Sequence, residues 1–447
     1  MDQASARAPA HQDHRHLDRF GSPARGSMSA LEAALAGVSA TRLADLTDML
    51  VSTASPTGRE GALAVRIAEA LDAAGVQANE QWLDASAANA WGTLGSPRRG
   101  PSLLLYSPID TITSGDAAED GALVGSGSRP DMEAKLRTER GWLVGLGAHN
   151  PKGHAACVLM ATEALAGVAA DLSGRIIAGF GCLGMPVNRR APDLLDGHGA
   201  GCTALLEAVR PDAAVIAKSG WSVSWNEVGL AWFTVRVAGI HTYVGSRHLL
   251  AYRNAIADAA ALILEVETWI DEWAETRADG FNRPQGIVAS VNGGDARATA
   301  FTADACEFTV DLRLPPGVAA DSAQRALSER VDQWAGAIGA SATVRRTLAI
   351  GGSCTDPSEP IVQAAIAAWE TETGRSHQAP RGFSGATDAN ILRQHGVPTA
   401  RIGLPKIAAP GVDVDFQYGM NAVNPDDQVA LSRHLIRTAF EYLQGAG

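Results

Sequence analysis

The sequence is poor in cysteine and has no long apolar run. Its five cysteines are scattered and form no Cys-x-x-Cys pair, which argues against a disulfide framework and a thiolate zinc site. No stretch of about 18 apolar residues is available to span a membrane, and the N-terminus lacks the apolar core of a signal peptide. We therefore expect a cytoplasmic protein.

Positive charge is also in short supply. The 49 acidic residues outnumber the 37 Lys and Arg residues, and the net charge is −12. Nucleic acids and anionic membrane surfaces select clustered positive charge, so neither is an expected partner. Small molecules and other proteins remain as the expected partner classes.

The first 27 residues are polar and have no apolar period, so we expect a disordered tail. His11, His14 and His16 lie close together in this tail. Weak metal binding is the alternative interpretation, but nothing in the sequence fixes the geometry of these histidines.

From residue 28 onward, helical and strand patterns alternate. Apolar residues recur at helical spacing over 29–50, 60–74 and 155–168, and short apolar runs at 102–110 and 174–181 are typical of strands. Strands that alternate with helices indicate a largely parallel sheet covered by helices.

The pattern changes after residue 221. Alternating strands at 230–239, 286–294 and 306–315, with a long helix at 254–270, indicate a β-α-β-β unit. We predict a catalytic-type α/β domain formed by 28–221 together with 346–447, interrupted by a smaller α+β lid domain at 222–345.

Nine short segments carry a family resemblance. In chain order they are SPTGREG (55–61), NAWG (89–92), SLLLYSPIDT (102–111), GLGAHNPKG (145–153), VIAKSGW (215–221), RNAI (253–256), FTVDLRLPPG (308–317), SGATDANIL (384–392) and GVPTARIG (396–403). Over roughly residues 45–440 the chain resembles the dizinc aminoacylase, acetylornithine deacetylase and succinyl-diaminopimelate desuccinylase family. Within that family it looks most similar to the branch that releases lysine or ornithine from an amino-group carrier protein.

The resemblance implies a zinc-peptidase-like catalytic domain with a mostly parallel sheet and a lid that forms a homodimer. It also implies two zinc ions and a bridging water that attacks an amide carbonyl. The positions that match the family's five metal ligands carry other residues here, namely Pro108, Asn150, Met185 or Pro186, Ala217 or Lys218, and Val423. We therefore expect no metal and no other cofactor, and bound zinc would contradict this mapping. A replacement zinc site built from Asp110, His149 and His154 is the alternative.

Several reactive side chains still map to the family's cleft. The candidates for catalysis are Asp110, His149, Lys152, His154, Lys218 and Ser219. A buried lysine can act as the base of a serine, so Lys218 and Ser219 are a candidate pair for metal-free acyl transfer. The candidates for substrate binding are Tyr243, Arg253, Asn254, Ser384, Gly385, Thr387 and Asp388. Tyr243 stands near the place where relatives have a histidine that polarises the scissile carbonyl, often across a dimer.

Two functions are compatible with these residues. The first is a metal-independent enzyme that acts on an amide or related C–N bond of an amino-acid-like substrate, either free or carrier-linked in a specialised pathway. The second is a catalytically silent relative that binds a small ligand or an amino-group carrier protein. We favour the enzyme, because the replacements include reactive residue types, and a conventional dizinc hydrolase is the least favoured. Such carriers are acidic, as this chain is, so a basic patch around Arg189, Arg190, Arg345 and Arg346 would be needed for docking.

Overall fold

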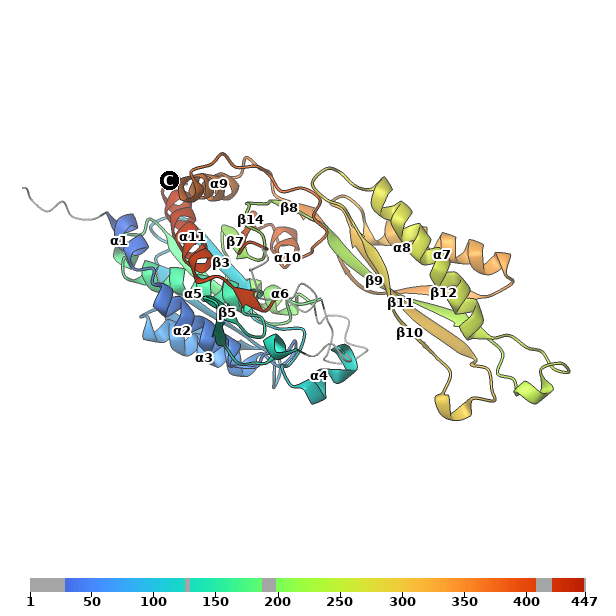
Figure 1. Cartoon of the computed structure of the whole chain (residues 1–447). Coiled ribbons are helices and arrows are strands. Elements are labelled where there is room, and N and C mark those ends of the chain that lie inside the picture. The colour runs from blue at the N-terminus through green and yellow to red at the C-terminus, as the bar shows by residue number, and fades with distance from the viewer. Residues whose placement is uncertain (1–28, 125–128, 187–197, 407–419, 446–447) are drawn as a thin grey trace, which may run out of the picture.

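The computed structural model describes residues 29–124, 129–186, 198–406 and 420–445, and these form two lobes (Figure 1). The larger lobe is built on a six-stranded sheet. Its strands, in spatial order, are β1 (Gln77–Trp82), β2 (Ala88–Gly95), β6 (Arg175–Gly181), β3 (Ser102–Pro108), β7 (Ala213–Ala217) and β14 (Thr399–Ile402). The last four run parallel, and β1 and β2 form an antiparallel edge. The mostly parallel sheet is confirmed.

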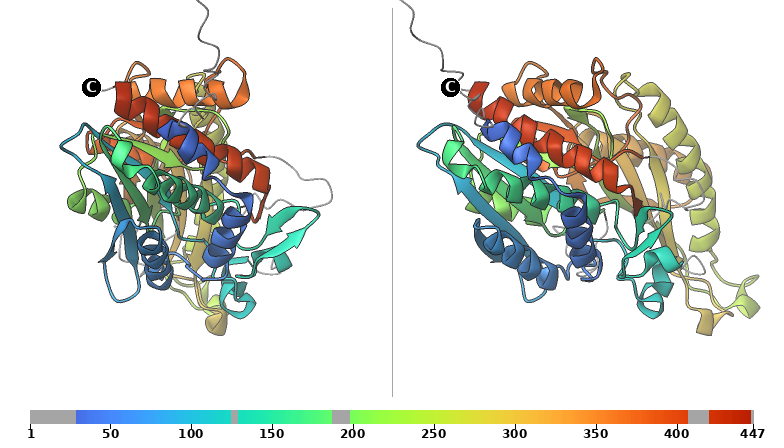
Figure 2. Two further views of the ribbon diagram at one scale, coloured as in Figure 1. Left: turned by 90° about the vertical axis from the view of Figure 1, so that its left-hand side faces the viewer. Right: turned by 60° about the vertical axis from the view of Figure 1, so that its left-hand side comes forward.

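Helices cover both faces of this sheet, which explains its continuous apolar strands (Figure 2). One face packs against α1 (Ala30–Ala36), α2 (Ala40–Val51), α3 (Gly61–Ala73), α5 (Lys152–Ala166), α9 (Pro360–Thr373) and α11 (Pro425–Gly445). The other face packs against α6 (Ala200–Ala208) and α10 (Ala389–Gln394). None of the helices within the described ranges is long and apolar enough to cross a membrane.

The helix predicted over residues 29–50 is two helices. Ser29 and Glu32 form a capping box that begins α1, and α1 ends at Gly37. The Ser39 side chain then accepts the Arg42 N–H and begins α2. The prediction of one continuous helix was wrong, because the apolar spacing continues through the second serine cap, Ser39, at which a new helix begins.

The smaller lobe, which we call the lid, is a four-stranded antiparallel sheet backed by two helices. Its strands, in spatial order, are β10 (Gly286–Gly293), β11 (Ala305–Leu314), β9 (Gly229–Ala238) and β12 (Ala342–Ile350), and its helices are α7 (Ala255–Thr276) and α8 (Ala320–Ala337). The predicted β-α-β-β unit was incomplete, because α8 and β12 extend it. The predicted boundary at residue 345 lies inside β12. That edge strand carries Arg345 and Arg346 and has little apolar alternation, so its pattern is weak.

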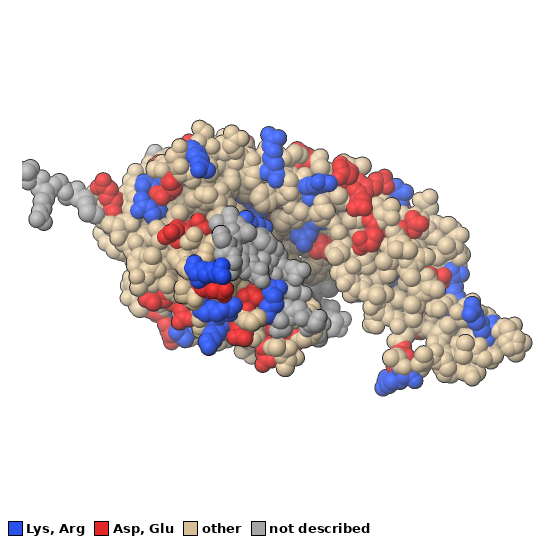
Figure 3. Space-filling model, viewed as in Figure 1, with Lys and Arg blue, Asp and Glu red and all other residues tan. Residues whose placement is uncertain are grey.

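The chain passes from the large lobe to the lid and back through two short strands. β8 (Asn226–Glu227) leads into the lid, β13 (Ser353–Cys354) follows it, and the two pair with each other. Figure 3 shows a hollow between the lobes on one face, with acidic and basic side chains intermixed over both. The predicted disordered tail at 1–27 lies outside the described residues.

Candidate functional site

The carboxyl ends of β3, β6 and β7 bring a set of buried titratable side chains together. Asp110 follows β3 and is fully buried. Its oxygens accept hydrogen bonds from the Thr57 hydroxyl (2.7 Å) and the backbone N–H groups of Gly184 (2.9 Å) and Met185 (2.8 Å). Burial raises the pKa of Asp110, while these donors and the Lys218 ammonium oppose that change. The donors hold this carboxyl group in one orientation.

Glu60 is a second buried carboxyl group beside Asp110. Its Oε1 accepts the N–H groups of Gly58 and Leu183 (2.8 and 2.9 Å), and its Oε2 is buried without a hydrogen-bond partner within the described ranges. Burial, and after it the Asp110 charge, raises the pKa of Glu60 to about 8. Glu60 was not predicted from the sequence, although an acidic residue in the SPTGREG turn was a visible signal.

Lys218 supplies the positive charge of this region. It follows β7 and is buried, and its Nζ lies 3.8 Å from the Met185 sulfur. Burial lowers the pKa of Lys218 to about 8, and the Asp110 and Asp388 charges oppose this effect. At neutral pH Lys218 is therefore mostly an ammonium group.

Asp388 completes the group, which we call the Lys218 cluster (Lys218, Asp110, Asp388, Glu60 and Tyr106). The Tyr106 hydroxyl donates to Asp388 Oδ2 at 2.7 Å, while Oδ1 is buried and has no hydrogen-bond partner among the described residues. A Cβ added to Gly184 would lie 3.0 Å from Asp388 Oδ2 and 3.3 Å from Asp110 Oδ1, so both carboxyl groups flank this glycine. Burial raises the pKa of Asp388 to about 7. The cluster thus holds an unsatisfied proton acceptor that changes charge near neutral pH.

A buried ion pair connects the lid entry to this region. Glu227 in β8 pairs with Arg401 in β14 at 3.0 Å and accepts the Thr387 hydroxyl at 2.7 Å. Arg401 also donates to the backbone oxygen of Ser219 at 2.8 Å. Thr387 precedes Asp388, so the pair supports the positions of both Asp388 and the turn at Lys218. An arginine inside the apolar strand of GVPTARIG was the signal that could have revealed it.

The predicted Lys218 and Ser219 pair does not meet through a hydrogen bond. Ser219 Oγ is buried and has no hydrogen-bond partner among the residues that the structure describes, and the same holds for Ser384 Oγ. The Lys218 ammonium contacts the Met185 sulfur instead. Gly385 has open space where a Cβ would stand.

His149 and His154 are neighbouring neutral imidazoles, with ring centroids 5.2 Å apart. His149 Nε2 faces the Pro405 carbonyl at 2.9 Å and must carry the proton there. His154 Nε2 accepts the Leu404 N–H at 3.0 Å, so its own proton lies on Nδ1. Burial lowers the pKa of His149 to about 4 and that of His154 well below its usual value.

These residues do not fit zinc. Asp110 is engaged by three donors, and His154 has no free lone pair for coordination while its Nε2 accepts an amide hydrogen. Within the described ranges, no group of three or more His, Cys, Asp or Glu side chains is placed to hold a metal ion. The positions mapped to the family's ligands are Pro108, Asn150, Met185 or Pro186, Ala217 or Lys218, and Val423. All of them are buried in this structure except Pro186, which is exposed, and Asn150, which is half-buried.

Within the described residues, Lys152 forms no ion pair with an acidic side chain. It begins α5, is fully buried, and its Nζ donates to the Thr53 carbonyl at 2.8 Å. Burial lowers the pKa of Lys152 to about 7. The position favours a structural role over the catalytic one considered from sequence.

Replacing Lys152 with methionine is expected to raise the free energy of unfolding at neutral pH by about 2 kcal/mol, after allowing for the lost bond to Thr53. The unfolded chain holds the Lys152 proton up to pH 10.5, and the folded chain only up to about 7. Wild-type stability therefore rises with pH across this window, and the variant lacks that contribution. Urea unfolding at several pH values measures it. Lys135→Met, at an exposed lysine, is the control, and a less stable K152M with the wild-type slope would refute the assignment.

The lid candidates have contacts within the lid. Tyr243 is half exposed and its ring lies against Phe301, with centroids 5.4 Å apart. Arg253 pairs with Asp258 at 2.7 Å, and Asn254 caps the start of α7. Arg253 and Asn254 therefore have local structural roles, whereas Tyr243 is available to another molecule.

Comparisons with known proteins agree with this architecture. Residues 226–337 match the family described as the peptidase dimerisation domain. Human carnosine dipeptidase 1 is similar in structure, with a TM-score of 0.69 and 16% identity over 93% of this chain and 99% of that chain. Aminopeptidase PepT from Bacillus cereus matches with a TM-score of 0.64 and 16% identity over 91% and 100% of the two chains. The M20 family metallo-carboxypeptidase Sso-CP2 from Sulfolobus solfataricus matches with a TM-score of 0.64 and 12% identity, over 90% of this chain and 99% of that chain.

Proposed function

We propose that this chain is a metal-independent hydrolase of an amide or related C–N bond. The chain has the fold of the M20 peptidases, with an inserted dimerisation domain. Its substrate would be an amino-acid-like small molecule. The observation that carries the proposal is the Asp388 carboxyl group in the Lys218 cluster, whose Oδ1 is buried without a hydrogen-bond partner in the part of the chain that the structure describes. Titratable groups with strongly shifted pKa values gather at functional sites more often than elsewhere.

The chemistry needs only these groups and water. Asp388 accepts a proton from a water molecule, whose oxygen forms a bond to the amide carbon. The Lys218 ammonium stabilises the negative charge that develops on the carbonyl oxygen. The C–N bond then breaks as protonated Asp388 returns the proton to the leaving nitrogen, which gives a carboxylic acid and an amine.

This division of roles defines a pH dependence. Asp388 acts as a base above its pKa of about 7, and Lys218 remains charged below its pKa of about 8. Turnover should rise with pH through the first value and fall through the second, with a narrow maximum between them.

Chelation is the direct test. Protein lacking residues 1–27 should contain far less than one zinc ion per chain and keep its turnover of N-acyl amino acids in the presence of a strong chelator. Metal content is measured by mass spectrometry and turnover by amine release across acetyl, succinyl and aminoacyl derivatives. Asp388→Asn is the matched inactive control. Turnover that disappears on chelation and returns with zinc would overturn the proposal.

We also propose a homodimer formed through the lid, which the match to the dimerisation domain supports. The lid exposes large apolar side chains, including Leu249 and Leu250 at 74% and 61%. Sedimentation should give a dimer for the wild type and a shift toward monomer for the double variant Leu249→Glu, Leu250→Glu. A wild-type monomer at all concentrations would contradict this assembly.

Ligand binding without turnover is the second candidate. The buried and unpartnered atoms His149 Nδ1, Ser219 Oγ and Ser384 Oγ favour it, because a ligand's polar groups would satisfy them. A carrier protein has less support than a small molecule. Arg346 is already paired with Asp321, and Arg189 and Arg190 lie outside the described residues. Calorimetric binding of a product amino acid with no release from any derivative would favour this candidate.

A further inference from the structure

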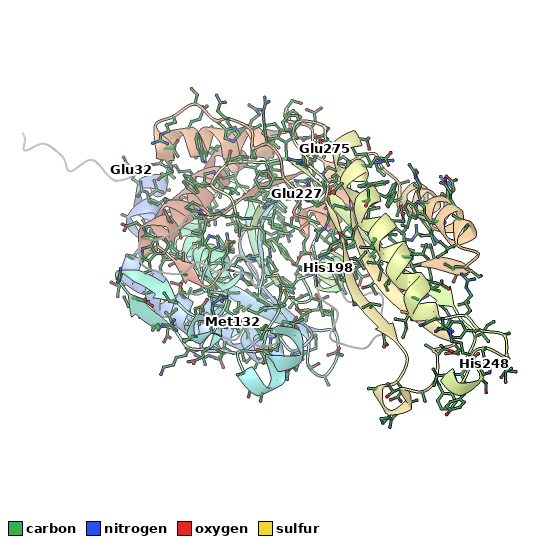
Figure 4. The ribbon with its side chains drawn as sticks, turned by 45° about the vertical axis from the view of Figure 1, so that its right-hand side comes forward. Glu32, Met132, His198, Glu227, His248 and Glu275 are labelled. Carbon is green, nitrogen blue, oxygen red and sulfur yellow. The ribbon has the colours of Figure 1, made fainter. Side chains whose placement is uncertain are left out.

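We propose that His198 is a positioning residue through which the lid controls the geometry of the Lys218 cluster. Its catalytic consequence rests on the proposed function. His198 is buried between the large lobe and the lid (Figure 4). Its imidazole contacts the lid on one side and the turn that holds Asp110 on the other.

The contact on the lid side is made by Trp232. Its neighbour Phe233 is buried among the lid helices, and successive strand residues face opposite sides, so Trp232 projects from the helix-free face of the sheet. Its Nε1 donates to Asp311 at 3.0 Å, which fixes the indole, and Asp311 is in turn paired with Arg313. The rings of Trp232 and His198 stack with centroids 6.4 Å apart and an interplanar angle of 29°.

The contact on the large-lobe side is a hydrogen bond of 2.8 Å between His198 Nδ1 and the Met185 carbonyl. A carbonyl only accepts, so Nδ1 carries the proton. Burial, together with the charges of Arg313 and Lys218, lowers the pKa of His198 to about 4, so the ring is neutral. The carbonyl contact therefore depends on one defined tautomer.

Met185 links His198 to the cluster. Its N–H donates to Asp110 Oδ2 at 2.8 Å, and its sulfur lies 3.8 Å from Lys218 Nζ. The same turn contains Leu183 with φ of 57°, in the left-handed region that residues other than glycine adopt uncommonly. Removing the donor at the Met185 carbonyl should therefore loosen the turn and misplace both Asp110 and Lys218.

A matched pair of variants separates the two contacts. His198→Asn keeps a side-chain N–H donor for the Met185 carbonyl but loses the ring, so this variant should keep the turn ordered. His198→Phe keeps a ring for Trp232 but has no donor. Hydrogen exchange of the peptide that contains the Gly184 and Met185 amides should accelerate about tenfold in H198F and stay near wild type in H198N.

Trp232→Ala supplies the lid side of the test. Without the indole, the imidazole is free to turn away from the Met185 carbonyl, so Trp232→Ala should accelerate exchange in this peptide in the wild-type background. It should have no effect in H198N, where the donor to the carbonyl is not held by the indole.

In H198F, the fall of turnover near pH 8 should move to higher pH, because a loosened turn exposes Lys218. A merely structural role would lower stability without moving that limb.

Equal exchange in wild type, H198F and W232A would overturn the positioning role. An unchanged pH limb in H198F with faster exchange would overturn its catalytic consequence. If the wild type turns over no substrate, the proposed function fails, while the exchange data still decide whether His198 couples the lid to the turn.

Discussion

Replacing Lys218 with methionine is expected to lower kcat/KM for an N-acyl amino acid by about 10²–10³-fold. The variant removes the only cation of the Lys218 cluster, which in the proposed step stabilises the developing oxyanion. Asp110 loses the same positive charge, so its pKa should rise further. Methionine has a similar length and suits a position that already contacts the Met185 sulfur. The fold should therefore survive.

Steady-state kinetics across pH provide the measurement. The wild type should lose turnover above pH 8, where Lys218 deprotonates, and the residual activity of K218M should lack this limb. Lys135→Met removes an exposed positive charge and should leave both the rate and the profile unchanged. A fully active K218M with a wild-type profile would exclude Lys218 from the reaction and leave ligand binding as the better function.

Replacing Arg401 with methionine is expected to lower the free energy of unfolding by about 3–5 kcal/mol, the usual cost of an uncompensated buried charge. Glu227 has no exposed surface, and among the described side chains only the Thr387 hydroxyl still donates a hydrogen bond to its carboxylate after the change. The Ser219 carbonyl also loses its donor. Urea unfolding measures the loss.

Two further variants make this result specific. The double variant Glu227→Gln, Arg401→Met removes the stranded charge and should recover part of the lost stability. Arg346→Met removes an arginine paired with a mostly exposed Asp321 and should cost less than about 1 kcal/mol. Equal losses in R401M and R346M would show that the buried pair contributes no more than a surface pair.

Sequence patterns predicted the elements whose side chains are buried along the whole element. β3 and β6 are buried on both faces, and the apolar runs that predicted them continue through the strands. The confirmed fold class followed from these runs and from the ordered family motifs. α8 and β12 were missed, because β12 is a polar edge strand and its burial depends on the neighbour that it pairs with.

The site was less predictable than the fold. Asp110, Lys218 and Asp388 were named from motifs, and the structure brings them together from three separate strand ends and loops. Glu60 and Arg401 were overlooked, although an acidic residue in a family turn and an arginine inside an apolar strand are visible signals. His198 gave no such signal, because its contact with Met185 depends on a turn of the large lobe and its contact with Trp232 on how the lid meets that lobe.

The insertion of the lid between β7 and β14 has a consequence for biosynthesis. These two strands are parallel neighbours in the large sheet, yet the whole lid separates them along the chain. An unfolded lid would be a long flexible loop that opposes their pairing entropically. Once folded, it brings its own ends together at the β8 and β13 pair. A lid that folds as it leaves the ribosome would thus shorten the effective tether, so that β14 docks as the final piece of an almost complete sheet.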